Sequence, residues 1–131
     1  MAKPPKNPDL IIGPMPVDAV NKTLGTEIDP GDVILTRGAQ RHAYKRHPRD
    51  YPRCLPHLAN VIANPRYIGD DHRNSGIEIW GYAAPVGSLV LVAIKLVPDA
   101  EGRYRISSFY IVSEKKAQSR RQKGFLKIVM A

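Results

Sequence analysis

Residues 36–48, TRGAQRHAYKRHP, contain the residue types needed for proton transfer beside a phosphate group. On a helix, His42, Lys45 and Arg46 are three or four residues apart and share one face, and a proline ends the helix directly after His47. Histidine can both give and accept a proton near neutral pH, and lysine and arginine stabilise the charge that builds on a reacting phosphorus centre. Cleavage of RNA without a metal needs these functions, since one group removes the 2′-hydroxyl proton and another protonates the leaving 5′-oxygen. The alternative is that these histidines are structural, as a histidine near a helix end often is.

A second candidate lies in the strand-like segment 106–111, ISSFYI. In a strand, Ser108 and Tyr110 point to one face, and Ser107 and Phe109 point to the other. A hydroxyl and a phenol side by side can bind a phosphate or position a base. The alternative is that Ser108 and Tyr110 form the solvent side of an amphipathic strand whose other side is core.

Other kinds of site find little support in the sequence. The four histidines and the single cysteine show no spacing typical of metal ligands, so we expect neither a metal nor another cofactor. Cys54 is expected to be a small, partly buried hydrophobic residue. Glu78 is expected on a strand surface, although a role as a base is conceivable. Motifs of serine hydrolases and phosphate-binding loops are absent from the sequence.

The chain is strongly basic, with 20 Lys and Arg against 12 Asp and Glu, a net charge of +8 and a pI near 9.8. Such a charge favours polyanionic partners, which include nucleic acid, an acidic protein and an anionic membrane surface. Twelve of the basic residues gather in two stretches, 37–53 and 115–127. These stretches predict either a groove for a phosphate backbone or two solvated helix faces. The residues that we expect to bind substrate are Arg37, Arg41, Arg46, Ser107, Arg120, Arg121 and Lys123.

The length of 131 residues indicates one domain with a single core. Residues 1–30 are rich in proline and are expected to be an arm or linker with a short helix over 17–24, and residues 31–131 to be the folded domain. Hydrophobic spacing there predicts a strand over 33–36, helices over 38–47 and 50–64, a meander of strands over 76–80, 89–97 and 103–112, and a basic C-terminal helix over 114–126. The fold class is therefore α+β, with helices first and a twisted antiparallel sheet after them. The longest apolar run, 89–94, is too short to span a membrane.

Four segments together resemble a known nuclease family: GDVILTRGAQRHAYKRHP, LANVIANPRYIG, ISSFYIV and RRQKGFL, in this order. They are similar to the phage-associated branch of the barnase–EndoU–colicin–RelE-like group, over about residues 31–126. The resemblance implies a small metal-independent ribonuclease, with N-terminal helices packed on about four antiparallel strands. It also implies that His47 is the helix histidine, with His42 second, and that Lys45 or Arg46 is the basic helper. Ser108 and Tyr110 match the Ser-x-aromatic pair of colicin D-like members, although Tyr110 stands where that relative has tryptophan.

The resemblance further implies a biological setting. Members act as RNA-cleaving toxins, often on tRNA, and an immunity protein or antitoxin holds them inactive. For this chain we therefore expect an RNA endonuclease toxin that produces a 2′,3′-cyclic phosphate, acts in the bacterial cytoplasm and is bound by an acidic immunity protein or antitoxin. Delivery from another cell or a phage, as a C-terminal toxin module, is part of the same expectation. The alternatives are a nucleic-acid-binding module that keeps the fold without catalysis, and a phage adaptor domain whose basic helices contact an acidic partner.

Overall fold

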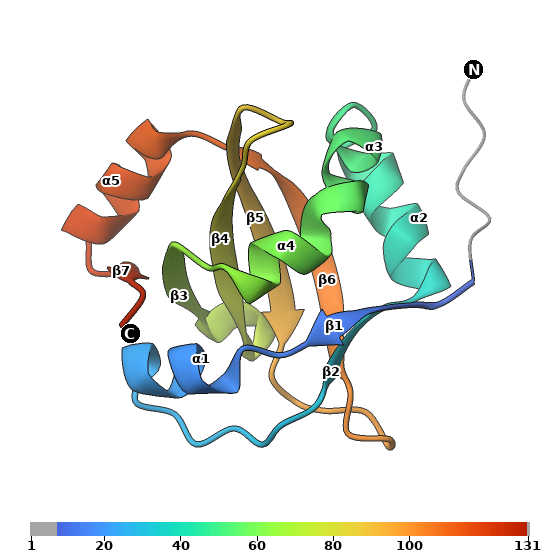
Figure 1. The fold of residues 1–131 in the computed structure, drawn as a ribbon, viewed down its shortest axis with the longest axis horizontal. Coiled ribbons are helices and arrows are strands. Elements are labelled where there is room, and N and C mark those ends of the chain that lie inside the picture. The colour runs from blue at the N-terminus through green and yellow to red at the C-terminus, as the bar shows by residue number, and fades with distance from the viewer. Residues whose placement is uncertain (1–7, 131) are drawn as a thin grey trace.

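The computed structural model describes residues 8–130, and in these residues seven strands form one sheet (Figure 1). The strand order is β1-β2-β6-β5-β4-β3-β7. The strands are β1 (Leu10–Pro14), β2 (Asp32–Leu35), β3 (Tyr67–Asp71), β4 (Gly76–Ala83), β5 (Ser88–Lys95), β6 (Tyr104–Val112) and β7 (Leu126–Ile128). Strands β4, β5 and β6 pair as the antiparallel meander that the sequence predicts. The pairing of β2 with β6 is parallel, so the sheet is mixed.

Short helices connect and cover these strands, and their ends follow local sequence signals. They are α1 (Val17–Leu24), α2 (Arg37–Arg46), α3 (Asp50–Cys54), η1 (Leu55–His57), α4 (Leu58–Ala63), η2 (His72–Asn74) and α5 (Glu114–Gln122). The side chain of Thr36 caps α2 by accepting a hydrogen bond from the Ala39 amide at 3.2 Å, and Ser113 caps α5 in the same way. The single helix expected over 50–64 is divided into α3, η1 and α4, since Pro52 and Pro56 interrupt regular helical hydrogen bonding. Within residues 8–130, no helix combines the length and apolar character that crossing a membrane requires.

The expected arrangement of helices followed by about four antiparallel strands is wrong. The first described element is strand β1, the helices lie between strands, and the sheet gains β1, β3 and β7. These three strands are short, and β1 and β7 form the two edges of the sheet. An edge position tolerates the proline at the end of β1 because one side of an edge strand needs no partner. The pairing of such strands depends on distant segments, which a local hydrophobic pattern does not show.

The predicted N-terminal arm contributes to this sheet. Strand β1 pairs with β2, and α1 forms over the expected residues with Val20 fully buried. Residues 1–7 of the predicted arm lie outside the described residues. The boundary placed at residue 30 stays a prediction.

The two faces of the sheet differ in how they are covered. On one face, Ile77, Ile79, Val92 and Phe109 pack in a large core that includes residues of α1 to α4. On the other face, a smaller cluster includes Trp80, Leu91 and Val112 of the sheet, Ala117 of α5 and Leu126 of β7. Figure 1 shows α4 crossing the sheet, while α5 lies beside the β7 edge. Helix α5 and β7 cover only part of the second face, and the remainder is where the candidate site lies.

Candidate active site

A cleft of about 1010 Å³ opens over the second face of the sheet. Its floor is the middle of β4, β5 and β6, one wall is the end of α2, and another is α5 with the turn after it. The segment of β3 and η2 completes the rim. The lining residues are His42, Arg46, His47, Asp70, Asp71, His72, Arg73, Asn74, Glu78, Ala93, Ser107, Ser108, Tyr110, Lys116, Arg120, Lys123 and Phe125.

Strand register places an acid and a hydroxyl across the floor of the cleft. Glu78 pairs with Ala93, and Ala93 pairs with Ser108, so the three residues form one row across β4, β5 and β6. Adjacent strands lie about 4.8 Å apart, and the backbones of Glu78 and Ser108 are therefore about 10 Å apart. The small side chain of Ala93 leaves the space between them open. This gap is wide enough for a phosphodiester group.

A bulge in β6 brings a second serine into the cleft. The register of β5 with β6 runs from Ala93 opposite Ser108 to Ile94 opposite Ile106, so Ser107 is the extra residue. Ser107 and Ser108 consequently both line the cleft, while Ile106 and Phe109 both enter the large core. The Ser107 hydroxyl donates to the Ala93 carbonyl at 3.3 Å. The prediction that Ser107 faces away from Ser108 is wrong because it assumed an unbroken two-residue period.

His47 lies against Tyr110 at the wall formed by α2. The two rings are stacked with centroids 4.4 Å apart and an interplanar angle of 23°. The Lys116 ammonium of α5 lies 5.9 Å from the centroid of the same Tyr110 ring. Tyr110 thus contacts groups from two different walls of the cleft. Burial raises the pKa of the Tyr110 phenol, and the nearby Glu78 raises it further, so at neutral pH the phenol is a hydrogen-bond donor.

The corner between α2 and α3 holds His47 in this position. Strand β2 pairs with β6 only at Tyr104 and Arg105, which leaves the later residues of that side of β6 without a strand partner. The Asp50 carboxylate accepts a hydrogen bond from the Ile111 amide at 3.1 Å and occupies part of this free edge. The Tyr51 amide donates to the His47 carbonyl at 2.9 Å. Asp50 therefore fastens the corner that carries His47 to the strand that carries Tyr110.

Glu78 is a site residue whose position the sequence left open. Its side chain is only 15% exposed, so it is a buried acid in the floor of the cleft and not a surface residue. The Trp80 indole donates to Oε1 of Glu78 at 3.2 Å, and the Arg120 guanidinium lies 3.3 Å from the same oxygen. Burial raises the pKa of this carboxyl, and Asp71 raises it as well, while Trp80, Arg120 and nearby Lys116 lower it. Residues two positions apart share one face of a strand, so the sequence could have placed Glu78 beside Trp80. It gives no sign of the contact between Glu78 and Arg120.

The cleft brings together most, but not all, of the residues that the sequence indicated. His42, Arg46, His47, Ser107, Ser108, Tyr110, Arg120 and Lys123 line it. Arg37, Arg41 and Lys45 do not line it, and Lys45 is exposed outside it. The sequence indicated Lys116 only as part of the basic C-terminal stretch, and it did not single out His72, Arg73 or Phe125. His72 and Arg73 occur in a segment without a recognisable pattern, and only folding places all four residues at the cleft.

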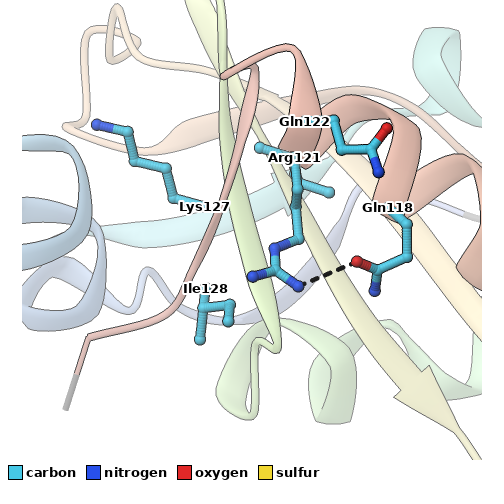
Figure 2. A pocket seen from close by; sticks show the side chains of 6 residues that line it. Gln118, Arg121, Gln122, Lys127 and Ile128 are labelled. Carbon is cyan, nitrogen blue, oxygen red and sulfur yellow. Dashed lines mark hydrogen bonds between the residues drawn. The ribbon is translucent and has the colours of Figure 1, made fainter.

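Arg121 lies in a second hollow, between α5 and β7 (Figure 2). This hollow is about 440 Å³ in volume and is lined by Gln118, Arg121, Gln122, Leu126, Lys127 and Ile128. Arg121 donates to the Gln118 side-chain carbonyl at 3.1 Å, and its guanidinium lies 5.8 Å from the centroid of the Tyr67 ring. Neighbouring arginines of α5 therefore point into different hollows, Arg120 into the cleft and Arg121 away from it.

Two further sequence expectations concern metal ligands and the cysteine. In the part of the chain that the structure describes, no three His, Cys, Asp or Glu side chains are grouped so that they could hold a metal ion. Cys54 is fully buried, and burial together with the nearby Asp50 raises the pKa of its thiol to about 11. Cys54 is therefore a neutral thiol at pH 7 and packs as a hydrophobic residue.

Comparison with known proteins gives one match. The family model for phage-Barnase-EndoU-ColicinE5/D-RelE like nuclease 3 matches residues 11–119, which extend from β1 into α5. No curated protein and no solved structure matches the chain. The matched range contains Glu78, His47 and both serines of the cleft.

Proposed function

Because the chain belongs to the phage-Barnase-EndoU-ColicinE5/D-RelE like nuclease 3 family, we propose that its cleft is the active site of an RNA endonuclease that needs no metal. The observation that carries this proposal is the position of His47 and Glu78 on either side of a gap lined by hydroxyls and cations. These are the groups needed to move two protons and to stabilise a negatively charged phosphorane. The nuclease class comes from the family, and the RNA substrate comes from the chemistry that these side chains supply.

The reaction that fits the cleft is attack of the RNA 2′-hydroxyl on the adjacent phosphorus. Glu78 is suited to accept the 2′-hydroxyl proton, since its raised pKa makes it a stronger base than an exposed carboxylate, and Arg120 holds its charged form in place. His47 is suited to donate a proton to the 5′-oxygen as the P–O bond to that oxygen breaks. The products are a 2′,3′-cyclic phosphate and a 5′-hydroxyl.

The remaining groups of the cleft are assigned to binding and charge stabilisation. Ser108 and the Tyr110 phenol can donate hydrogen bonds to the non-bridging oxygens of the phosphate. Arg120 and Lys116 stabilise the negative charge that develops on them. Arg46 lines the cleft and takes the part of basic helper in place of Lys45. His42 remains the second candidate for proton transfer.

The biological setting is proposed on the family likeness and on charge. A net charge of +8 suits an RNA substrate, among which tRNA is our first choice. It also suits an acidic immunity protein or antitoxin that covers the same cleft. We propose that the chain acts as a toxin in the bacterial cytoplasm, either made there or delivered from another cell or a phage.

The proposal is tested by incubating the purified chain with total RNA in EDTA and mapping the new ends. We expect cyclic phosphate and 5′-hydroxyl ends. His47→Ala should lower the cleavage rate by about 10²- to 10⁴-fold, because that is the contribution typical of a proton-transfer group. RNA binding and thermal stability should change little in this variant. His42→Ala is the matched control, and it should retain most of the activity.

Three results would contradict the proposal or part of it. Activity that disappears in EDTA and returns with added Mg²⁺ would mean that a metal carries out the chemistry. Loss of activity in His42→Ala, with His47→Ala only lowering the melting temperature, would exchange the roles of the two histidines. An absence of cleavage together with tight RNA binding would indicate the binding module instead of the enzyme.

A further inference from the structure

Phe125 is a large apolar side chain exposed at the rim of a polar cleft. It is 60% exposed and lines the cleft directly after α5 and its basic turn. Among the large hydrophobic side chains that residues 8–130 expose, Phe125 is the one that lines this cleft. Single exposed hydrophobic residues are common on protein surfaces, but their position beside a catalytic cleft needs a reason.

Backbone hydrogen bonds form the turn that places Phe125 in this exposed position. Gly124 adopts a left-handed conformation with φ of 80°, and its amide donates to the Arg121 carbonyl at 3.0 Å. The Phe125 amide donates to the Arg120 carbonyl, also at 3.0 Å. Its carbonyl packs so closely on Gly69 that a Cβ there would lie 2.6 Å from the oxygen. At a helix end of this type the apolar side chain usually packs back on the helix, whereas Phe125 remains largely exposed.

Several cationic side chains share the cleft with Phe125, and Asp70 and Asp71 of β3 line it as well. Lys123 lines the cleft two residues earlier, and Arg73 lines it from η2. Deeper in the cleft, Lys116 and Arg120 approach the proposed reaction centre. Exposed aromatic rings beside backbone-binding cations are the combination that binds single-stranded nucleic acid, because each ring stacks on a base while the cations contact phosphates.

We propose that Phe125 is a stacking platform for an unpaired nucleobase of the RNA strand, next to the phosphodiester that is cut. Lys123 and Arg73 bind the phosphates that flank this base. This proposal depends on the proposed function, because it takes that RNA strand to be the substrate. It adds a preference to that function, since a base within a duplex has both faces covered by its neighbours and cannot stack on Phe125. The chain should therefore select single-stranded loops or ends.

The test measures binding without cleavage. The probe is a fluorescein-labelled, fully 2′-O-methylated RNA of about 12 nucleotides, a length within the range that single-strand binding folds cover. This probe lacks the nucleophilic 2′-hydroxyl. Its affinity is measured by anisotropy, both as a single strand and annealed to its complement. Phe125→Ala should weaken single-strand binding by about 5- to 160-fold, the loss expected for one base–aromatic stack, and leave duplex binding unchanged.

Two control variants support the interpretation. Phe125→Trp should bind the single strand as well as the original chain, because it keeps an aromatic face. Ile128→Ala removes a side chain that is 55% exposed and lines the second hollow, so it should change neither affinity. Thermal melting of Phe125→Ala should be close to that of Ile128→Ala, since the two side chains are exposed to a similar extent and their truncation removes similar amounts of buried area.

The inference is overturned if Phe125→Ala leaves single-strand binding unchanged, as expected for a ring that contacts a protein partner. It is also overturned if single-strand and duplex affinities fall equally. Failure of the proposed function is separate from these outcomes. Strand binding that depends on Phe125, together with intact natural RNA in the cleavage assay, would retain the stacking platform and remove the nuclease activity.

Discussion

At the scale of single residues, Glu78 offers a test through pH. Burial is the largest influence on its carboxyl and raises the pKa, while Trp80, Arg120 and Lys116 lower it. If Glu78 is the base, kcat/KM should fall as pH decreases through this raised pKa, at a higher pH than the value of about 4.3 for an exposed glutamate. Glu78→Gln should remove this acidic limb together with most of the activity. Arg120→Gln removes a neighbour that lowers the pKa of Glu78. In this variant the acidic limb of the kcat/KM profile should therefore move to higher pH. A shift of that limb to lower pH would contradict the assignment of Glu78 as the base.

The same carboxyl gives a readout that needs no activity. The folded state binds the Glu78 proton more tightly than the unfolded chain does. Its contribution to stability is therefore fully present below the unfolded carboxyl pKa and is lost as pH rises through the folded pKa. In urea denaturation, the stability of the original chain relative to Glu78→Gln should decrease over that window. A relative stability that increases with pH there would mean that ionised Glu78 is the form favoured by folding.

The residues of the site differ in how far the sequence could predict them. His47 and Tyr110 stand out because their types and spacing suit the chemistry, and the structure stacks their rings. Ser107 was placed on the wrong face because the bulge in β6 arises from its pairing with β5. The sequence predicts Glu78 on a strand surface, with a base role left open, and it gives no sign of the contact with Arg120, which is 42 positions away in the chain. A local pattern carries no information about such a partner.

At the scale of elements, the contact between α3 and β6 can be broken at one side chain. Asp50→Ala would leave the Ile111 amide without its acceptor, and because this hydrogen bond is part-buried we expect a cost of about 1 kcal/mol, the lower end of the range for buried donors. It should also release the corner that carries His47, so cleavage should fall by more than the stability loss explains. Asp50→Asn is the matched control, because its amide oxygen can still accept the hydrogen bond. Denaturation and cleavage assays should therefore rank the original chain and Asp50→Asn above Asp50→Ala, and equal behaviour of the two variants would show that this contact does not position the site.

Elements with strong local signals were predicted well, and elements that depend on distant partners were not. The apolar run of β5 and the capped helix α2 are visible in the sequence, and the structure contains both. Strands β1, β3 and β7 have only five, five and three residues. Each is stabilised by a neighbour that tertiary folding supplies, as when β7 pairs with β3 after α5 has crossed the second face. These strands lack the unbroken β-branched and aliphatic run that identifies the equally short β2 in the sequence.

At the scale of the whole molecule, only some residues of the two basic stretches lie together in the cleft. From the first stretch Arg46 enters the cleft, and from the second Lys116, Arg120 and Lys123 do. The other cations lie elsewhere, including Arg121 and Lys127 in the second hollow (Figure 2). The positive charge of the chain therefore acts in two ways. Under the proposed function, all of it would attract RNA at long range, and the smaller set in the cleft would contact phosphates.

Lys123→Ala and Lys127→Ala separate these two effects, because each removes one lysine from the same turn–strand segment but from different hollows. A lysine that contacts a phosphate releases a counterion on binding, so its loss flattens the plot of log K against log salt concentration by about one unit. We expect this change for Lys123→Ala with single-stranded RNA. Lys127→Ala should lower affinity slightly at low salt, through the long-range field alone, and flatten the slope by much less than one unit. Equal flattening in both variants would show that the RNA continues past α5 into the second hollow, where Arg121 would then contact it as the sequence first indicated.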